Sequence, residues 1–314
     1  MLALVVSEIG GKVAIHQRSE PQRSKGDSLI RVKAAVVGHL DSTISTGSLG
    51  VHPELPYIPG VEAAGVVVES DSLAPGTGVV IRGAGVGVFS NGTWAEYVCV
   101  SDQALMPIPQ GLDFQLAAGF FVPTTTAFIA VHDIGKISSD STVLVTGVRG
   151  AVGSLTAEMC INAGARVVGM SRDTQSPLPP HLNSVEISDY CAAVDGEVLS
   201  QFDLVVDTVA GNGFSERLSR VKQGGIVALV GYAAGSAVDI GVPGWILSDT
   251  TVVPVNMLNR EVRAREVSQL LAQELLAGRL HLHMAGYSPT NIHAAQADVQ
   301  SGKIRGRAYI SFDS

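Results

Sequence analysis

The stretch that decides the fold runs from residue 142 to residue 164 and reads TVLVTGVRGAVGSLTAEMCINAG. It begins with a short apolar and β-branched run, continues through three glycines at 147, 150 and 153, and ends with helix-forming residues before Gly164. A second apolar run, RVVGM at 166–170, follows directly. Strand, glycine loop, helix and strand in this order predict a dinucleotide site, because the helix N-terminus presents free N–H groups to a pyrophosphate.

The loop itself has the composition that such a site needs. Small residues let the chain turn sharply and let its backbone approach the pyrophosphate. The loop contains no Gly-Lys-Ser/Thr sequence, which argues against a P-loop nucleotidase. The alternative interpretation is an ordinary structural turn, because a glycine pattern alone is a weak signal. The residues that we expect to line the pyrophosphate site are Gly147, Arg149, Gly150, Ala151, Val152 and Gly153.

The end of the second strand predicts which dinucleotide is bound. Sites for NAD usually place Asp or Glu here, where the carboxylate binds the ribose 2′-hydroxyl. This chain has Ser171 and Arg172 instead, and a hydroxyl with a guanidinium suits a 2′-phosphate. Two alternatives stay open: Arg172 is only a solvated loop residue, or Asp173 serves as the carboxylate of an NAD site. We favour NADPH as the cofactor.

Outward from this unit, the chain divides into a β-rich part and an α/β part. Residues 1–110 contain short strand-like runs at 2–8, 28–37, 63–70, 76–83 and 92–100. Asn91-Gly92 lies between two of these runs and predicts a hairpin. The glycines at 83–92 are interpreted as strand and turn glycines, because no helical pattern follows them.

From residue 112 onward, helical and strand patterns alternate. Residues 113–135 have helical spacing, with a break expected at Pro123. Further strands are expected at 202–210 and 224–232, and helices at 215–221, 261–277 and 289–300. The run 307–312 alternates as an exposed strand would. Continuous β-branched strands between helices predict a parallel sheet buried on both faces.

Composition excludes several classes of function. The 314 residues include 21 Lys and Arg against 29 Asp and Glu, a net charge of −8. This balance argues against nucleic acid and against an anionic membrane surface as partners. The long apolar stretches 112–132 and 224–247 contain Asp, Pro and Gly, so they predict buried core rather than membrane spans. The start of the chain lacks the pattern of a signal peptide. Cys99, Cys160 and Cys191 form no CxxC pair, and a reducing cytoplasm is expected.

Seven motifs together resemble the medium-chain dehydrogenase/reductase superfamily, and specifically its zinc-independent quinone oxidoreductase and enoyl reductase branch. Besides the glycine loop, they are AAVVGHLDSTISTG (34–47), LPYIPGVEAAGVV (55–67), GTWAEYVCV (92–100), LAAGFFVPTTTAF (116–128), DLVVDTVAG (203–211) and GGIVALVGY (224–232). The resemblance implies an α/β protein with a GroES-like β-barrel catalytic domain and a Rossmann domain, a doubly wound parallel sheet. The catalytic domain would be split over 1–112 and 256–314, with the Rossmann domain at 113–255. Cofactor and substrate would meet in the cleft between the two domains.

The same resemblance implies that no metal is bound. Zinc-dependent relatives hold their catalytic ion with Cys, His and a further Cys or Asp, and the corresponding positions here carry Gly38, Val61 and Val122. Only the neighbouring Glu62 remains, and the four-cysteine structural lobe is missing. These side chains cannot supply a tetrahedral zinc site. His281 and His283 could share one strand face, but two histidines without further ligands are usually ordinary surface.

Roles for single residues also follow from the resemblance. Tyr57 lies where several zinc-independent relatives place a tyrosine in the cleft, and we expect it to be catalytic; packing against its neighbouring prolines is an equally good interpretation. A second tyrosine of the family is replaced by Leu49. The expected further contacts to the cofactor come from His39, for which a buried core histidine is the slightly favoured alternative, and from Thr126, Gly231, Tyr232, Leu258 and Gly306. Asp41 resembles a structural Asp of the family. Relatives continue after Arg172 with a helix, which the prolines of DTQSPLPPHLNS (173–184) forbid.

The expected function is an NADPH-dependent, zinc-independent reductase of an α,β-unsaturated carbonyl or a quinone. Without zinc, hydrogen bonds must stabilise the enolate or quinol oxygen while the nicotinamide supplies the hydride. The alternatives are an enoyl-thioester reductase of specialised metabolism and a non-catalytic NADP-binding protein. The expected partner is a small-molecule substrate: an enone, a quinone or an acyl thioester. A homodimer formed by sheet extension through 224–232 and the apolar run 236–255 is a further expectation from the resemblance.

Overall fold

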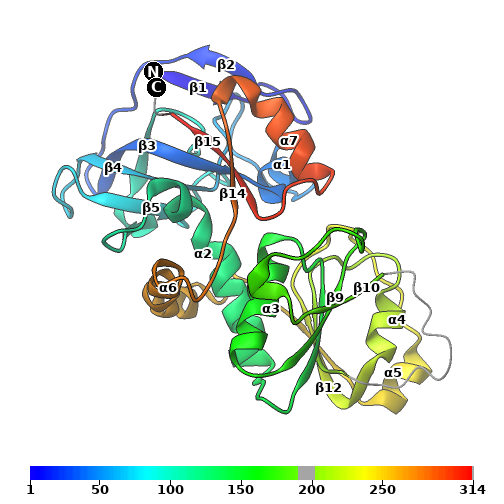
Figure 1. Ribbon diagram of the computed structural model, residues 1–314. Helices are drawn as coiled ribbons and strands as arrows, with labels where there is room; N and C mark the ends of the chain where they lie inside the picture. Colours follow the sequence, from blue (N-terminus) through cyan, green and yellow to red (C-terminus); the bar gives the residue numbers. More distant parts are fainter. Residues whose placement is uncertain (190–201, 313–314) are drawn as a thin grey trace. The chain divides into compact units, whose positions relative to one another are not determined.

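The computed structural model describes residues 1–189 and 202–312, and Cys191 lies outside them (Figure 1). The chain forms two compact units, one of Met1–Phe121 with His283–Ser314 and one of Val122–Leu282. Both boundaries lie further along the chain than the expected ones at 112 and 255. The long helix α6 (Glu261–Leu276) belongs to the second unit, where Arg263 pairs with Asp133 at 3.0 Å.

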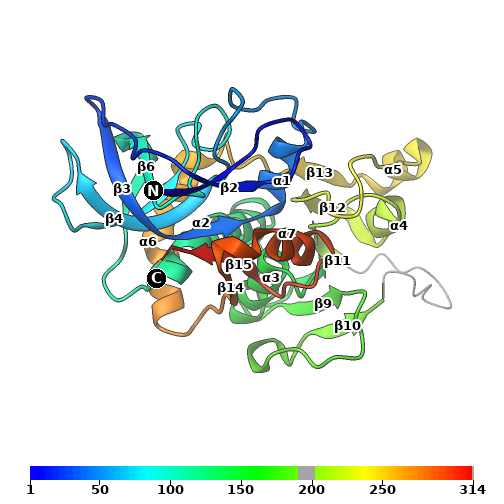
Figure 2. The same ribbon diagram turned by 90° about the horizontal axis from the view of Figure 1, so that it is seen from above.

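The second unit contains a six-stranded sheet in the order β10-β9-β8-β11-β12-β13, with every neighbouring pair parallel. Apolar side chains of the central strands are fully buried, as a sheet covered on both faces requires. The strands are β8 (Thr142–Thr146), β9 (Arg166–Met170), β10 (Glu186–Ser188), β11 (Phe202–Asp207), β12 (Val221–Leu229) and β13 (Thr251–Pro254). The helices α3 (Ala151–Asn162), α4 (Phe214–Ser219) and α5 (Val242–Ser248) join them (Figure 2). The predicted doubly wound parallel sheet is confirmed.

The first unit contains a mostly antiparallel, GroES-like sheet in the order β14-β15-β3-β4-β5-β7, in which β6 also pairs with β3. Its strands are β3 (Asp27–Val37), β4 (Glu62–Glu69), β5 (Gly78–Arg82), β6 (Tyr97–Ser101), β7 (Leu105–Pro107), β14 (Met284–Tyr287) and β15 (Arg307–Ser311). The hairpin β1 (Leu2–Val5) and β2 (Ala14–Gln17), and the helices α1 (His39–Ser45) and α7 (Ile292–Gln300), complete the unit. Strand β15 was expected to be exposed, but it lies between β14 and β3 with Ala308 and Ile310 buried.

The hairpin predicted at Asn91-Gly92 is wrong. Strand β5 pairs with β4 and β7, while β6 pairs with β3, so the two flanking runs never meet. Asn91 instead accepts a hydrogen bond from the N–H of Ile58 with its Oδ1, at 2.9 Å. A Cβ on Gly92 would lie 2.2 Å from the carbonyl oxygen of Gly60. Asn91 and Gly92 therefore contact the loop that contains Ile58 and Gly60, and they do not form the turn of a hairpin.

The break expected at Pro123 is also absent. Helix α2 (Phe114–Phe128) continues through Pro123 and ends in a π-helical turn, Ile129–Ile134. A proline inside a helix removes the hydrogen bond to the carbonyl oxygen four residues earlier, here that of Gly119, and burial of this apolar helix outweighs the loss. The whole segment Phe114–Ile134 is long and apolar enough to cross a membrane by length and composition alone. Because 72% of its most apolar window is buried in the protein, it has the burial of a core helix.

Candidate cofactor site and active site

The glycine loop between β8 and α3 has the geometry of a phosphate-binding turn. Gly147 has φ +60°, and a Cβ there would lie 2.5 Å from the hydroxyl of Thr208. A Cβ on Gly153 would lie 2.2 Å from the carbonyl oxygen of Gly147, so only glycine permits the tight turn. Gly150 is the N-cap of α3 and supplies no side-chain hydrogen bond. The first-turn N–H groups, which include those of Ala151 and Val152, therefore have no side-chain cap and suit a pyrophosphate.

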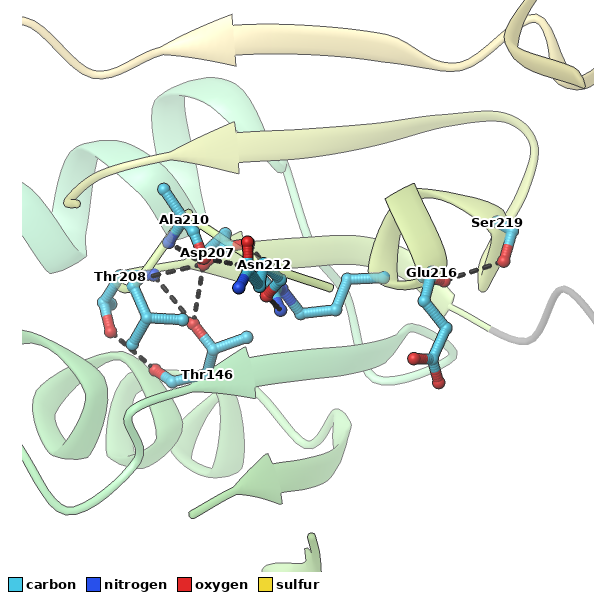
Figure 3. A network of polar contacts seen from close by, with 9 residues as sticks. Thr146, Asp207, Thr208, Ala210, Asn212, Glu216 and Ser219 are labelled. Atoms are coloured by element: carbon cyan, nitrogen blue, oxygen red, sulfur yellow. Dashed lines mark hydrogen bonds and ion pairs between the residues drawn. The ribbon is translucent and has the colours of Figure 1, made fainter. Parts of the chain in front are cut away.

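This loop lies at the topological switch point of the parallel sheet. The strand order runs from β8 to β10 in one direction and from β11 to β13 in the other, so the crevice opens between β8 and β11. At that edge Asp207, the last residue of β11, is fully buried. Its Oδ1 accepts hydrogen bonds from the hydroxyl of Thr146 at 3.0 Å and from the N–H groups of Val209 and Ala210 (Figure 3).

Arg217 of α4 completes this buried network. Its Nε donates to Oδ2 of Asp207 at 2.7 Å, and its other nitrogens donate to the carbonyl oxygens of Ala210 and Asn212. Thr208 ties the two walls of the crevice together, because its N–H donates to the Thr146 hydroxyl and its own hydroxyl donates to the Thr146 carbonyl oxygen, both at 2.8 Å. Sequence reasoning missed Asp207 and Arg217. The available signal was an acid closing the apolar run FDLVVD.

The end of β9 is organised by Arg149 of the glycine loop. Its Nε donates to the hydroxyl of Ser171 at 3.2 Å and to the carbonyl oxygen of Asp173 at 2.9 Å. Its remaining nitrogens donate to the carbonyl oxygens of Ser176 and Pro177. One guanidinium thus holds the proline-rich segment that follows β9.

Asp173 accepts hydrogen bonds within its own turn, whereas Arg172 is exposed to solvent. Oδ1 of Asp173 accepts hydrogen bonds from the N–H groups of Gln175 and Ser176, at 3.2 and 2.9 Å. The hydrogen bonds from Ser176 lower the pKa of Asp173 to about 2, so the carboxylate stays charged within its own turn. Arg172 is exposed to solvent, and Ser171 before it is buried.

The remaining predicted residues of the second unit lie on several elements. Gly231 follows β12, and a Cβ there would lie 2.5 Å from the carbonyl oxygen of Thr208, so it borders the same crevice. Tyr232 and Leu258 have 54% and 77% of their surface exposed. With so little of their surface buried, they would contact a bound ligand from its solvent-exposed side. Thr126 of α2 is buried, and its hydroxyl has no hydrogen-bond partner among the described residues.

Two of the predicted residues of the first unit, His39 and Tyr57, lie near the charged side chains of Arg307 and Asp41. His39 begins α1, and burial together with the charge of Arg307 lowers its pKa. Gly306, just before Arg307, has φ +121° and approaches the backbone of His283 too closely for any Cβ. Tyr57 belongs to the apolar core with 1% of its surface exposed, and its hydroxyl has no partner among the described residues. Burial, assisted by the charge of Asp41, raises the pKa of Tyr57 to about 12.

Two of the positions that hold zinc in relatives are occupied in another way. The N–H groups of Gly38 and Val61 both donate to the buried carboxylate of Asp41, at 2.8 and 3.1 Å. Burial raises the pKa of Asp41 to about 6. Glu62, also buried, pairs with Arg307. Neither Gly38 nor Val61 offers a ligand atom, and a guanidinium already neutralises Glu62, so this group of residues does not fit a catalytic zinc ion.

Comparisons with known proteins agree with this arrangement. Residues 24–110 match the alcohol dehydrogenase GroES-like domain, and residues 143–223 match the NAD dependent epimerase/dehydratase family. The chain is 27% identical to a quinone oxidoreductase of Rattus norvegicus over 88% of this chain and 86% of that protein. It is 25% identical to the acrylyl-CoA reductase AcuI of Ruegeria pomeroyi over 99% of both chains. The quinone oxidoreductase of Thermus thermophilus, solved also with NADPH, superposes with a TM-score of 0.81 at 23% identity, over 99% of this chain and 100% of that one.

The Rossmann sheet with its glycine loop and the GroES-like sheet define an NAD(P)-dependent oxidoreductase of two units. Over nearly its whole length the chain is similar to proteins of the medium-chain dehydrogenase/reductase superfamily, among them quinone oxidoreductases and an acrylyl-CoA reductase.

Proposed function

We propose that the protein is an NADPH-dependent, zinc-independent reductase that transfers hydride to an activated C=C bond or to a quinone. The observation that carries the choice of cofactor is the hydroxyl of Ser171. Its oxygen accepts hydrogen bonds from Nε of Arg149 and from the N–H of Asp173, both at 3.2 Å. A serine hydroxyl has two acceptor sites and one donor, so the remaining O–H hydrogen is available to donate. A donor at the end of β9 suits a 2′-phosphate, which only accepts.

The other contacts of the cofactor follow from the same elements. The first-turn N–H groups of α3 would bind the pyrophosphate, and Arg172 would add a charged donor to the 2′-phosphate. The network around Asp207 fixes the walls of the crevice in which the nicotinamide half would lie. Bound there, the reduced nicotinamide supplies the hydride.

Tyr57 is the residue that we propose to assist the substrate. A buried hydroxyl without a partner is unfavourable by about 1–3 kcal/mol, and a substrate oxygen would satisfy it. A raised pKa keeps this hydroxyl protonated at neutral pH, so it acts as a hydrogen-bond donor to a developing oxyanion. The two interpretations of Tyr57, packing and catalysis, therefore coexist in one side chain.

A second candidate is the reduction of an enoyl thioester. It is favoured by the similarity to a protein described as an acrylyl-CoA reductase, which extends over 99% of both chains. The two candidates share the hydride step and differ only in the group that activates the C=C bond. A cytoplasmic location and a homodimer remain predictions of ours.

Loss of NADPH absorbance in the presence of simple enones, quinones and acyl-CoA thioesters tests the proposal. We expect turnover with at least one of these classes, and faster turnover with NADPH than with NADH. Treatment with EDTA should leave the rate unchanged, because positions 38 and 61 offer no zinc ligand. Tight NADPH binding without turnover of any class would instead identify a non-catalytic binding protein.

A further inference from the structure

Three side chains from distant parts of the chain converge on one surface of the second unit. Glu158 lies on α3, His181 on the 3₁₀ helix Pro180–Leu182, and His281 after α6. One ligand atom of each, a carboxylate oxygen or an imidazole nitrogen, lies within 4.8 Å of the other two. Among the described residues this is the one group of three or more His, Cys, Asp or Glu that meets this distance. His281 therefore does not act with His283, as its spacing in the sequence suggested.

The carboxylate is buried and held in place, whereas the imidazoles are accessible. Glu158 has 3% of its surface exposed, and its Oε2 accepts a hydrogen bond from the backbone N–H of His281 at 2.8 Å. Its Oε1 lies 2.6 Å from Nδ1 of His281. The side chain of His281 is 47% exposed, and its ring stacks on that of His181 with centroids 4.3 Å apart. A fixed acceptor thus faces two rings that solvent can reach.

We propose that Glu158, His181 and His281 form a binding site for a divalent transition-metal ion, with Zn²⁺ as the physiological candidate. Two imidazoles with one carboxylate are a donor set that zinc prefers, and three protein ligands leave a fourth position for water. None of these residues is at position 38, 61 or 122, the positions that the resemblance assigns to the ligands of a catalytic zinc ion. A metal ion here would contradict the expectation that the protein binds no metal. That expectation rested on positions 38, 61 and 122 and on the pair His281 and His283.

Binding requires a small rearrangement. The two rings are nearly parallel, with 11° between their planes, so their nitrogen lone pairs cannot point to one ion at about 2.0 Å while the stack persists. The side chain of His281 is 47% exposed, and a turn of its ring about the Cβ–Cγ bond would break the stack. The ion then takes the place of the hydrogen on Nδ1 of His281, and in a neutral imidazole that hydrogen moves to Nε2, so the ring stays neutral.

The ion would add a bond between three segments that lie far apart in the sequence. Helix α3 begins at the glycine loop. His181 lies near the end of the proline-rich segment 173–184, and Arg149 holds the beginning of that segment through the carbonyl oxygen of Asp173. A metal bridge would therefore fasten both ends of this segment to the unit that contains the parallel sheet. Because the ion binds the folded state and its ligands are far apart in the unfolded chain, Zn²⁺ should raise the melting temperature.

Titration of the metal-stripped, full-length protein with Zn²⁺ alone, followed by calorimetry, tests the site. Titration with Co²⁺ alone adds a spectroscopic measurement, because four-coordinate Co²⁺ absorbs strongly in the visible range. We expect one ion per chain and a rise in melting temperature. His181→Ala and His281→Ala should each weaken Zn²⁺ binding at least about tenfold, as should Glu158→Gln, since even outer-shell changes cost about 10–100-fold.

His283→Ala is the matched control, because it removes an exposed histidine two residues from His281. It should leave the affinity, the Co²⁺ spectrum and the thermal shift unchanged. If Glu158→Gln fails to fold, the two histidine variants decide, because both rings reach the surface. Absence of 1:1 binding in the wild type, or equal loss of affinity in His281→Ala and His283→Ala, would overturn the proposal.

Discussion

Each unit of the molecule contains a buried aspartate, Asp41 in one and Asp207 in the other, and the two carboxylates have different hydrogen-bond partners. Asp207 in the parallel-sheet unit has a guanidinium at 2.7 Å and further donors from Thr146 and two backbone N–H groups. Asp41 in the GroES-like unit has two backbone N–H donors, from Gly38 and Val61, while Arg307 pairs with Glu62 instead. One charge is neutralised where it is buried, and the other is not.

This difference separates a rigid site from a titratable one. A buried carboxylate that is bonded to a guanidinium and to three further donors is held in one position, which fixes the shape of the switch-point crevice. A buried carboxylate with only amide donors is desolvated without full compensation, and the pKa of Asp41 is raised for that reason. We infer that the cofactor crevice is preorganised, whereas the charge near His39 and Tyr57 responds to pH.

Removal of the guanidinium should give the largest effect. Arg217→Leu leaves the charge of Asp207 buried without a partner, and breaking a buried pair in this way costs about 3–5 kcal/mol. Arg166→Leu is the control, because its pair with Glu186 is 59% and 57% exposed and should contribute less than about 1 kcal/mol. Urea unfolding followed by circular dichroism measures both. Equally small losses in the two variants would show that the Asp207 network does not stabilise the sheet.

The pH dependence of stability should identify Asp41. Its folded pKa of about 6 exceeds the value of about 3.9 in an unfolded chain, so the native state binds more protons between these values. The free energy of unfolding should therefore fall as pH rises from about 4 to 6, by at most about 3 kcal/mol. Asp41→Asn should lack this component. Parallel pH profiles for wild type and variant would contradict the assignment.

Tyr57→Phe should have a smaller effect, and on catalysis rather than on stability. Loss of one main oxyanion donor costs about 10²–10³-fold in kcat, and we expect the lower end of this range or less. Stability should be unchanged or slightly higher, because the removed hydroxyl has no partner. Tyr287→Phe is the control: it loses a hydrogen bond to Asp298 and should leave kcat unchanged. An unchanged kcat with a raised KM would assign Tyr57 to packing alone.

The sequence predicted those features that depend on neighbouring residues. The strands β8, β9, β11 and β12 were predictable because each is a continuous apolar run, and the glycine loop because its small residues occur in strict order. The hairpin at Asn91-Gly92 failed because strand pairing is decided by partners elsewhere in the sheet. The break at Pro123 failed because burial of α2 outweighs one lost hydrogen bond.

For the candidate site, local pattern singles out the residues of the loop and Ser171, and their roles stay predictions. Local pattern does not reveal the partners that orient these residues. Arg217 meets Asp207 only because α4 folds back on β11, and Glu158 meets His281 across 123 residues of sequence. Such contacts depend on how the helices and strands pack, so the spacing of the residues in the sequence does not predict them.

The central claim is that the end of β9 selects NADPH, and the affinity ratio of NADPH to NADH tests it most directly. Two binding titrations with Arg172→Ala measure that ratio, with Arg166→Ala at the opposite end of the same strand as control. Charge-assisted hydrogen bonds contribute about 1.5–3 kcal/mol, so Arg172→Ala should weaken NADPH binding roughly 10- to 150-fold and leave NADH nearly unchanged. Ser171→Asp should lower the ratio further, because a carboxylate repels the phosphate and accepts from the ribose hydroxyl. A ratio that stays at its wild-type value in Arg172→Ala and in Ser171→Asp would contradict the account.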